Sequence, residues 1–199
     1  AVFFPVFFLI LFWTDTEDCN IMQQKGMVWV IGASGGLGRA TAQAFAQNGW
    51  SVIAGARSFA EGTSPLGEGV TVLPLDVTSE ESCTAFVKKA LGMENRVDVL
   101  VCAAAQLVLG SCENTTVDEL DKLLNVNVLG TVRMIQRALP LMRAQKSGKI
   151  ILFSSINGLL GIPFQSAYTA SKHALEGYAE CLAMETADFG IQVCLVEPG

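Results

Sequence analysis

From residue 27 onward the sequence alternates between short apolar runs and stretches with helical periodicity. The expected strands are 27–31, 51–55, 70–76, 97–103, 149–155 and 191–199, and the expected helices are 37–48, 79–91, 117–125, 131–145 and 167–188. Strands that alternate with helices predict a parallel sheet with helices on both faces. The chain is therefore expected to form a doubly wound α/β domain, with ligands bound beyond the carboxyl ends of the strands.

The composition supports one folded domain and argues against some classes of ligand and partner. The chain has 199 residues, of which 51% are hydrophobic and 16% are charged, and this fits a single domain with a sizeable core. A net charge of −6 without any basic run argues against nucleic acid as a partner. The single histidine, His173, argues against a histidine-built metal site, and we expect no metal. The six cysteines form no CxxC pair, which argues against a zinc ribbon or a thioredoxin-type motif. Four of them lie in apolar or helical stretches, which favours reduced, buried thiols and a cytoplasmic protein.

Residues 1–26 do not fit the alternating pattern. Their first thirteen residues, AVFFPVFFLILFW, are apolar, and a polar segment follows. A spanning helix needs about 20 apolar residues and a signal peptide needs a positive n-region, so we do not expect a membrane partner. Three origins stay open: sequence upstream of a start at Met22 or Met27, the end of a longer membrane segment, or a signal-like anchor. We expect 27–199 to form the catalytic domain and 1–26 to lie outside the fold.

The first motif with chemical meaning is a glycine cluster between the first expected strand and helix. It reads Gly32-Ala33-Ser34-Gly35-Gly36-Leu37-Gly38. Backbone N–H groups at a helix N-terminus bind anions, and glycine allows a pyrophosphate to approach the backbone closely. An ordinary βα turn uses the same residue types, so this motif alone does not establish a nucleotide site.

A second group of polar residues follows the fifth expected strand. Tyr168 and Lys172 are four residues apart on the longest expected helix, so they share one face. An ammonium held beside a phenol favours the phenolate, which suits acid–base work near neutral pH. Ser155 ends the fifth strand, where a hydroxyl could polarise a substrate carbonyl. Each feature alone also has a simpler reading, as a surface pair or as a turn cap.

Together these motifs resemble the short-chain dehydrogenase/reductase family, whose fold is of the Rossmann type. The matches are Ile31 to Gly38 for TGxxxGxG (with Ile31 in place of Thr), Asp76 for the acidic residue after the third strand, Asn127 to Gly130 for NxxG, Ser155, Tyr168 and Lys172 for the catalytic serine and YxxxK, and Pro198-Gly199 for PG. Segments 96–102, 125–134 and 170–177 are similar to the branch of 17β-hydroxysteroid and retinol dehydrogenases. That branch implies a hydrophobic alcohol or ketone as substrate.

The resemblance implies a role for each matched residue. Tyr168 would be the general acid in ketone reduction, Lys172 would hold the nicotinamide ribose, and Ser155 would bind the substrate oxygen. Asn127 would kink its helix and position a water that connects Lys172 to solvent. The residues implied to bind the cofactor are Gly32, Ser34, Gly36, Leu37, Gly38, Arg57, Asp76, Val77, Ala103, Ala104, Tyr168, Lys172, Pro198 and Gly199.

The end of the second expected strand favours NADP(H) over NAD(H). An NAD site carries an acidic residue there, which accepts from the ribose 2′-hydroxyl. Here the position holds Ala56, followed by Arg57, and a guanidinium suits a 2′-phosphate. We therefore expect an NADPH-dependent reductase of small or hydrophobic carbonyl compounds. The alternatives are an NAD-dependent alcohol dehydrogenase and a non-catalytic dinucleotide sensor.

The sequence departs from the family pattern at two places. The NNAG that follows the fourth strand is replaced by Cys102-Ala103-Ala104-Ala105, which lacks the Asn side chains that tie neighbouring strands together. The family also continues beyond PG into a substrate loop, a final strand and a helix, so we expect this chain to be truncated at its C-terminus. The family implies a homodimer or homotetramer, paired through the helices that carry Asn127 and Tyr168.

Overall fold

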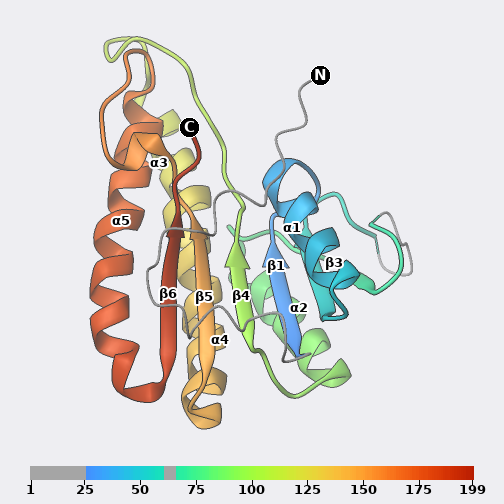
Figure 1. The fold of residues 1–199 in the computed structure, drawn as a ribbon. Coiled ribbons are helices and arrows are strands. Elements are labelled where there is room, and N and C mark those ends of the chain that lie inside the picture. Colours follow the sequence, from blue (N-terminus) through green and yellow to red (C-terminus); the bar gives the residue numbers. More distant parts are fainter. Residues whose placement is uncertain (1–25, 61–65) are drawn as a thin grey trace.

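The computed structural model describes residues 26–60 and 66–199 (Figure 1). The apolar segment and most of the polar linker predicted at 1–26 lie outside the described residues. The strands are β1 (Met27–Ile31), β2 (Ser51–Ala56), β3 (Val70–Pro74), β4 (Val99–Cys102), β5 (Gly148–Phe153) and β6 (Ile191–Val196). The α-helices are α1 (Gly36–Gln47), α2 (Glu80–Met93), α3 (Val117–Leu124), α4 (Gly130–Gln145) and α5 (Ser166–Thr186).

All six strands belong to one parallel sheet with the order β3-β2-β1-β4-β5-β6. This order reverses between β1 and β4, which creates a switch point at the carboxyl ends of these strands. Figure 1 shows the strands pointing the same way, with the loops after β4 and β5 rising beyond their carboxyl ends. The predicted doubly wound Rossmann-type fold is confirmed.

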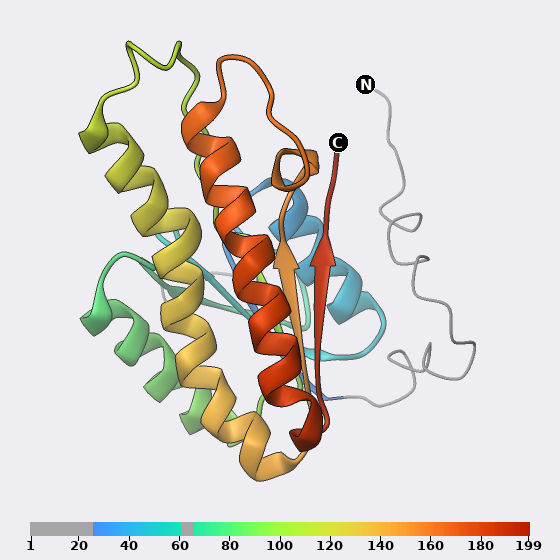
Figure 2. The ribbon, with the colours of Figure 1, turned by 90° about the vertical axis from the view of Figure 1, so that its left-hand side faces the viewer.

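Alternate side chains of each central strand enter two separate cores. In β1, Trp29 and Ile31 pack in the larger core with Phe86 of α2, Met134 of α4 and Leu182 of α5. The intervening residues of β1 belong to a smaller core beneath α1. Figure 2 shows α2, α4 and α5 on one face of the sheet and α1 on the other. Burial on both faces explains why the strands read as continuous apolar runs.

One expectation about the helices is wrong. The two helices expected around Gly130 are a single helical segment, because α3 continues through a π-helical turn, Asn125–Leu129, into α4. Gly130 does not break the helix, since its backbone is helical. It allows close packing instead, because a Cβ there would lie 2.6 Å from Val77 Cγ2. A π turn inserts an extra residue and changes the direction of the side chains around it.

Two of the α-helices have side-chain caps at their N-termini. The Ser79 hydroxyl accepts from the Ser82 amide at the start of α2. Thr116 and Glu119 form a reciprocal capping box at the start of α3.

Among the described residues no helix is long and apolar enough to cross a bilayer. The five cysteines within the described ranges are unpaired, and the cytoplasmic setting stays a prediction.

Candidate active site

The glycine cluster forms the turn between β1 and α1, as expected. Gly32 has a φ of +90°, and a Cβ there would lie 2.5 Å from Ala104 Cα, so only glycine fits against the chain leaving β4. Gly35 and Gly36 have the opposite surroundings, because a Cβ on either would meet nothing within 4 Å. No side chain caps α1 at Gly35, so its first N–H groups have no partner within the helix. The turn is therefore an open cradle at a helix N-terminus, which fits a pyrophosphate.

Arg57 and Asp76 lie beside this cradle at the ends of β2 and β3. The Asp76 carboxylate accepts from the Thr78 amide (2.9 Å) and the Thr78 hydroxyl (2.7 Å). These two hydrogen bonds lower the pKa of Asp76, and the nearby Arg57 guanidinium acts in the same direction. Arg57 itself is exposed, so it is available to an anionic ligand at the end of β2.

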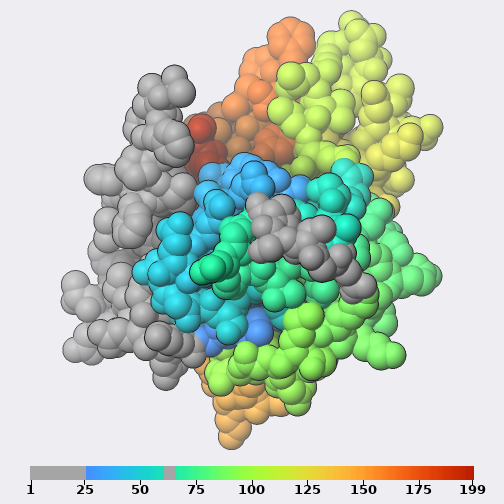
Figure 3. All heavy atoms as spheres, turned by 90° about the vertical axis from the view of Figure 1, so that its right-hand side faces the viewer, coloured from blue at the N-terminus to red at the C-terminus, as the bar shows by residue number. Residues whose placement is uncertain are grey.

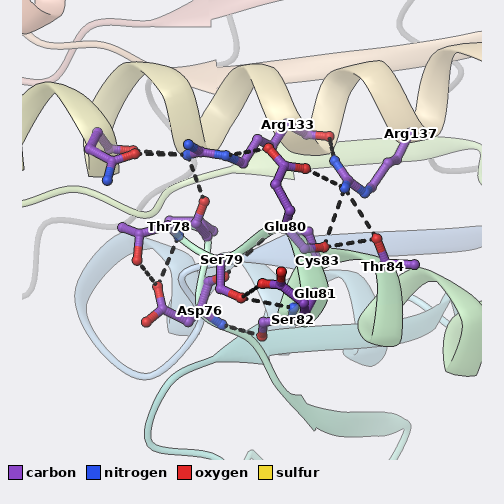
Figure 4. A network of polar contacts seen from close by, with 12 residues as sticks. Asp76, Thr78, Ser79, Glu80, Glu81, Ser82, Cys83, Thr84, Arg133 and Arg137 are labelled. Carbon is purple, nitrogen blue, oxygen red and sulfur yellow. Dashed lines mark hydrogen bonds and ion pairs between the residues drawn. The ribbon is translucent and has the colours of Figure 1, made fainter.

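A polar network fixes the segment after Asp76 to the helices behind it (Figure 4). Arg133 of α4 donates to Glu80 Oε1 (2.8 Å), to the Val77 carbonyl (3.1 Å) and to Asn125 Oδ1 (2.9 Å). Arg137 donates to Glu80 Oε2 at 2.6 Å. The network therefore links the loop that carries Asp76 and Val77 to the π turn that carries Asn127.

Lys172 is a buried cation on the inner face of α5. Its side chain is 2% exposed, and Nζ donates to the carbonyl of Phe153, the last residue of β5, at 2.6 Å. Burial lowers the pKa of Lys172 to about 8, and the charge of Glu176 opposes part of this shift. Nζ lies 5.4 Å from the centre of the Tyr168 ring. The expected pairing of Tyr168 and Lys172 on one helix face is therefore present.

Ser155 lies where β5 ends and a 3₁₀ turn, Ile156–Gly158, begins. Its hydroxyl is 3.3 Å from Asn157 Oδ1 and 3.3 Å from the Pro198 carbonyl oxygen after β6. The Asn157 side-chain amide donates to Gln165 Oε1 (3.1 Å) and to Thr169 Oγ1 (3.0 Å). Asn157 thus connects the Ser155 hydroxyl to the N-terminal turns of α5, where Tyr168 lies.

Asn127 is fully buried in the π turn, and its side chain has three hydrogen bonds. Oδ1 accepts from the Gln106 amide (2.7 Å), and Nδ2 donates to the Gln106 carbonyl (2.9 Å) and to Ser171 Oγ (3.0 Å). The change in helix geometry implied for Asn127 is present as this π turn. The side chain holds the segment after β4 against α5, while the water implied between Asn127 and Lys172 stays a prediction.

The family model for "short chain dehydrogenase" matches residues 26–199. The chain is a member of the short-chain dehydrogenase family. It is 40% identical over 176 residues to a 3-ketodihydrosphingosine reductase from Bacteroides thetaiotaomicron, covering 88% of this chain and 64% of the relative. It is 44% identical over 128 residues to estradiol 17-beta-dehydrogenase 1 of Rattus norvegicus, covering 64% and 37% respectively. The chain therefore spans less than two thirds of the length of these curated relatives.

A solved structure supports the same fold for this short-chain dehydrogenase. The structure titled "ElxO with NADP Bound" superimposes with a TM-score of 0.81 at 32% sequence identity. The match covers 88% of this chain and 73% of that chain. Among the solved relatives there is thus one with the dinucleotide in place.

The CAAA segment of this short-chain dehydrogenase is held by backbone contacts. The Ala103 amide donates to the Ile31 carbonyl at 2.8 Å, and the backbone of Ala104 lies directly against Gly32. Gln106, just beyond the segment, is fixed by Asn127. Cys102 is buried strand core, and burial raises the pKa of its thiol to about 12. In this chain the segment after β4 is therefore tied to β1 by backbone contacts and to the π turn by Asn127.

The structure brings the predicted residues to one edge of the sheet in two groups. Ser34, Gly36, Leu37 and Arg57 are exposed around the β1–α1 turn, and Asn127, Ser155 and Lys172 are buried between the ends of β4 and β5 and helix α5. Pro198 contacts Ser155 and Ile156 through its carbonyl oxygen, while Gly199 is exposed.

Sequence reasoning missed two polar residues of this site, Asn157 and Glu176. Asn157 lies two residues after Ser155, and Glu176 lies one helical turn after Lys172. That spacing, on the same turn and on the same helix face as matched catalytic residues, was the available signal.

Proposed function

We propose that the protein is an NADPH-dependent oxidoreductase that interconverts a ketone and a secondary alcohol. The observation that carries the proposal is the buried Lys172 ammonium beside the Tyr168 ring, on the same sheet edge as Ser155. A sensor that only binds a dinucleotide does not need a tyrosine beside a buried cation. Family membership and the NADP-bound relative support a nicotinamide cofactor.

Each residue of the site has its own role in the proposed ketone reduction. The Tyr168 hydroxyl gives its proton to the substrate oxygen, and the neighbouring Lys172 charge stabilises the phenolate that remains. The Ser155 hydroxyl donates to the same oxygen and lowers the energy of its developing charge. The Asn157 backbone amide, which donates to Ser155 Oγ at 3.3 Å, holds the hydroxyl in place. For this contact the Ser155 proton would turn from Asn157 Oδ1 or the Pro198 carbonyl to the substrate oxygen. In alcohol oxidation Tyr168 accepts the proton instead.

The bound nicotinamide would supply the hydride. The open turn at Gly35 and Gly36, with the uncapped start of α1, would hold its pyrophosphate. Arg57 would bind the 2′-phosphate of the adenosine ribose, and Asp76 would lie beside the adenine. Lys172 would hold the nicotinamide ribose, since its ammonium lies at the carboxyl end of β5 beside Tyr168.

We further propose that the substrate is hydrophobic. The loops after β4 and β5 lie side by side, joined by the Gly110 amide and the Phe164 carbonyl at 2.9 Å. In Figure 3 these loops project beyond the β1–α1 turn, which is drawn in blue. Five of their large apolar side chains are exposed: Leu107, Leu109, Leu159, Leu160 and Phe164. The two curated relatives are named for 3-ketodihydrosphingosine and estradiol, both hydrophobic, which supports the same class here.

The proposal is tested by turnover of a panel of ketones in the full-length protein with NADPH and with NADH. We expect the ratio of kcat/KM for NADPH over NADH to exceed one. A charge-assisted contact from Arg57 contributes about 1.5–3 kcal/mol, which is roughly tenfold to over a hundredfold in affinity. The double substitution Ala56→Asp with Arg57→Ala should therefore reverse the ratio.

An exposed arginine elsewhere provides the matched control. Arg143 lies near the end of α4 over the Phe189 ring, so Arg143→Ala should leave the cofactor ratio unchanged. A wild-type ratio below one, or a ratio unmoved by the double substitution, would contradict the NADPH assignment. Absence of turnover with every ketone and both cofactors would favour the sensor.

We also propose that two copies pair through the helical face that carries α3 and α5. These helices lie side by side on one face of the sheet in Figure 2. Exposed apolar side chains lie along this helical layer, with Val117 on α3, Leu129 in the π turn and Met184 on α5. Sedimentation should give a dimer or tetramer, and Met184→Glu should shift it toward the monomer. A monomeric wild-type protein would contradict this pairing.

A further inference from the structure

Glu176 is an acidic side chain next to the catalytic residues that the mechanism above does not use. It lies on α5 one turn beyond Lys172 and is half-buried. Its carboxylate accepts a hydrogen bond from the hydroxyl of Ser154, which is 3% exposed. A carboxylate taken out of water costs free energy unless it is hydrogen-bonded or paired. The half-buried Glu176 carboxylate therefore depends on its contacts with the protein, and those contacts indicate its role.

The turn that carries Ser155 lies directly against this carboxylate. Gly158 ends the 3₁₀ turn that Ser155 begins. A Cβ at Gly158 would lie 2.5 Å from Glu176 Oε1 and 2.5 Å from Ser154 Oγ, so glycine is needed for the contact. The neighbouring serines thus have separate partners: Ser154 donates to Glu176, while Ser155 contacts Asn157 and Pro198.

Glu176 is also the charge that acts on the buried ammonium of Lys172. Within the described residues, the groups close to that ammonium are the Tyr168 ring on α5 and the neutral carbonyl of Phe153 on β5. The titratable groups on the other elements around α5 include Cys102 at the end of β4, Lys149 on β5, Cys194 on β6, Glu197 after β6, and Asp118, Glu119, Asp121 and Lys122, which are exposed on α3. None of these contributes to the shift of the Lys172 pKa.

We propose that Glu176 is a positioning residue of the active site, which anchors the Ser155 turn through Ser154 and keeps the buried Lys172 in its ammonium form at neutral pH. The role of that ammonium in holding the ribose and in assisting Tyr168 rests on the proposed function. The electrostatic coupling itself is a property of the protein without cofactor or substrate, so it can be measured separately.

The direct test is an NMR titration of protein labelled with ¹³C at the lysine ε-carbons, with Lys172→Met to assign the Lys172 signal. Burial already lowers the pKa of Lys172 to about 8. Glu176→Gln keeps the size of the side chain and removes the charge, so the Lys172 pKa should fall further, by about one unit. Glu176→Asp keeps the charge and should restore most of the wild-type value.

Glu180 provides the matched control, because it is an exposed carboxylate one turn further along α5. Glu180→Gln should leave the Lys172 titration unchanged. Equal titration of Lys172 in wild-type protein and in folded Glu176→Gln would overturn the inference. So would an equal fall of the Lys172 pKa in Glu180→Gln, because the effect would then be one of net charge.

The pH profile of kcat/KM for ketone reduction connects this coupling to the proposed function. Its alkaline limb should move to lower pH by the same amount in Glu176→Gln. Ser154→Ala keeps the charge and removes the anchor, so it should lower kcat without moving the limb. A limb that moves as far in Ser154→Ala as in Glu176→Gln would refute the electrostatic role. If the wild-type protein shows no turnover, the proposed function fails, and the NMR titration still decides the role of Glu176.

Discussion

The two halves of the sheet hold their functional residues in opposite ways. In the cofactor half, which is the described chain up to residue 96, the start of α1 and the end of β2 are open: a Cβ on Gly35 or Gly36 would meet no atom within 4 Å, and Arg57 is exposed. In the catalytic half, residues 97–199, Asn127 and Lys172 are buried and hydrogen-bonded to protein. We therefore expect an anionic ligand to bind at the open turn of the cofactor half, whereas the proposed reacting groups of the catalytic half are already held by contacts within the protein. Groups that are already held in position need little reorganisation when the reaction occurs, so little free energy is spent on moving them.

The largest effect should come from Gly32, where the β1–α1 turn of the cofactor half packs against the chain that leaves β4. A Cβ there would enter the backbone of Ala104, and the φ of +90° disfavours any side chain. We expect Gly32→Ala to lower the free energy of unfolding by about 4 kcal/mol. Gly36 also has a positive φ (+53°), but a Cβ there would meet no atom within 4 Å. Gly36→Ala should therefore cost only the backbone strain, about 1 kcal/mol, and weaken NADPH binding at least about tenfold.

Denaturant unfolding and cofactor fluorescence on the two variants separate these outcomes. Similar stability losses for Gly32→Ala and Gly36→Ala would contradict the distinction between a packed glycine and an open one. Unchanged NADPH binding by Gly36→Ala would show that the cradle is not where the pyrophosphate binds.

The next effect is expected in the catalytic half, at Asn127. Asn127→Ala removes three buried hydrogen bonds and leaves the Gln106 backbone without its side-chain partner. The expected loss in the free energy of unfolding is about 3 kcal/mol, or roughly 10 °C in Tm for a chain of this size. Asn95→Ala, at an exposed asparagine before β4, is the control and should change Tm little. A loss at Asn127 no larger than at Asn95 would mean that the segment after β4 is held by other contacts.

A smaller effect should appear in the pH dependence of stability, at Lys172. Its pKa in the folded state is about 8, below the ordinary 10.5, so the unfolded chain binds more protons between these values. Wild-type stability should therefore rise from pH 8 to pH 10.5 relative to Lys172→Met, by about 2 kcal/mol. Urea unfolding at several pH values measures this difference. Parallel curves for the two proteins would show that the ammonium is not desolvated.

Much of the fold could be predicted from the sequence, because strands buried on both faces have a strong signature. The runs 27–31 and 51–55 became β1 and β2 with at most one residue of difference. The π turn at Asn125–Leu129 could not be predicted from periodicity. Its residues make contacts distant in sequence, namely Asn127 with Gln106 and Ser171, and the neighbouring Arg133 of α4 contacts Glu80.

The site shows the same division between local and long-range information. Tyr168 and Lys172 could be paired from their helical spacing, and the glycine turn from its position after a strand. The supports of the site could not be read in this way. Asn157 and Glu176 become relevant only once β5, the 3₁₀ turn and α5 pack together and bring them to Ser155 and Ser154. Their residue types are common in loops and on helix surfaces, so their spacing from Ser155 and Lys172 was only a weak signal in the sequence.

The central claim is that the Tyr168 hydroxyl is the proton donor of the site, and Tyr168→Phe tests it most directly. The substitution keeps the ring beside Lys172 and removes only the hydroxyl. In the full-length protein we expect ketone reduction with NADPH to fall by about a thousandfold. The affinity for NADPH, measured by cofactor fluorescence, should change by less than about twofold, since a ring without its hydroxyl still packs beside the ribose site. Retention of more than a few per cent of wild-type turnover would contradict the account.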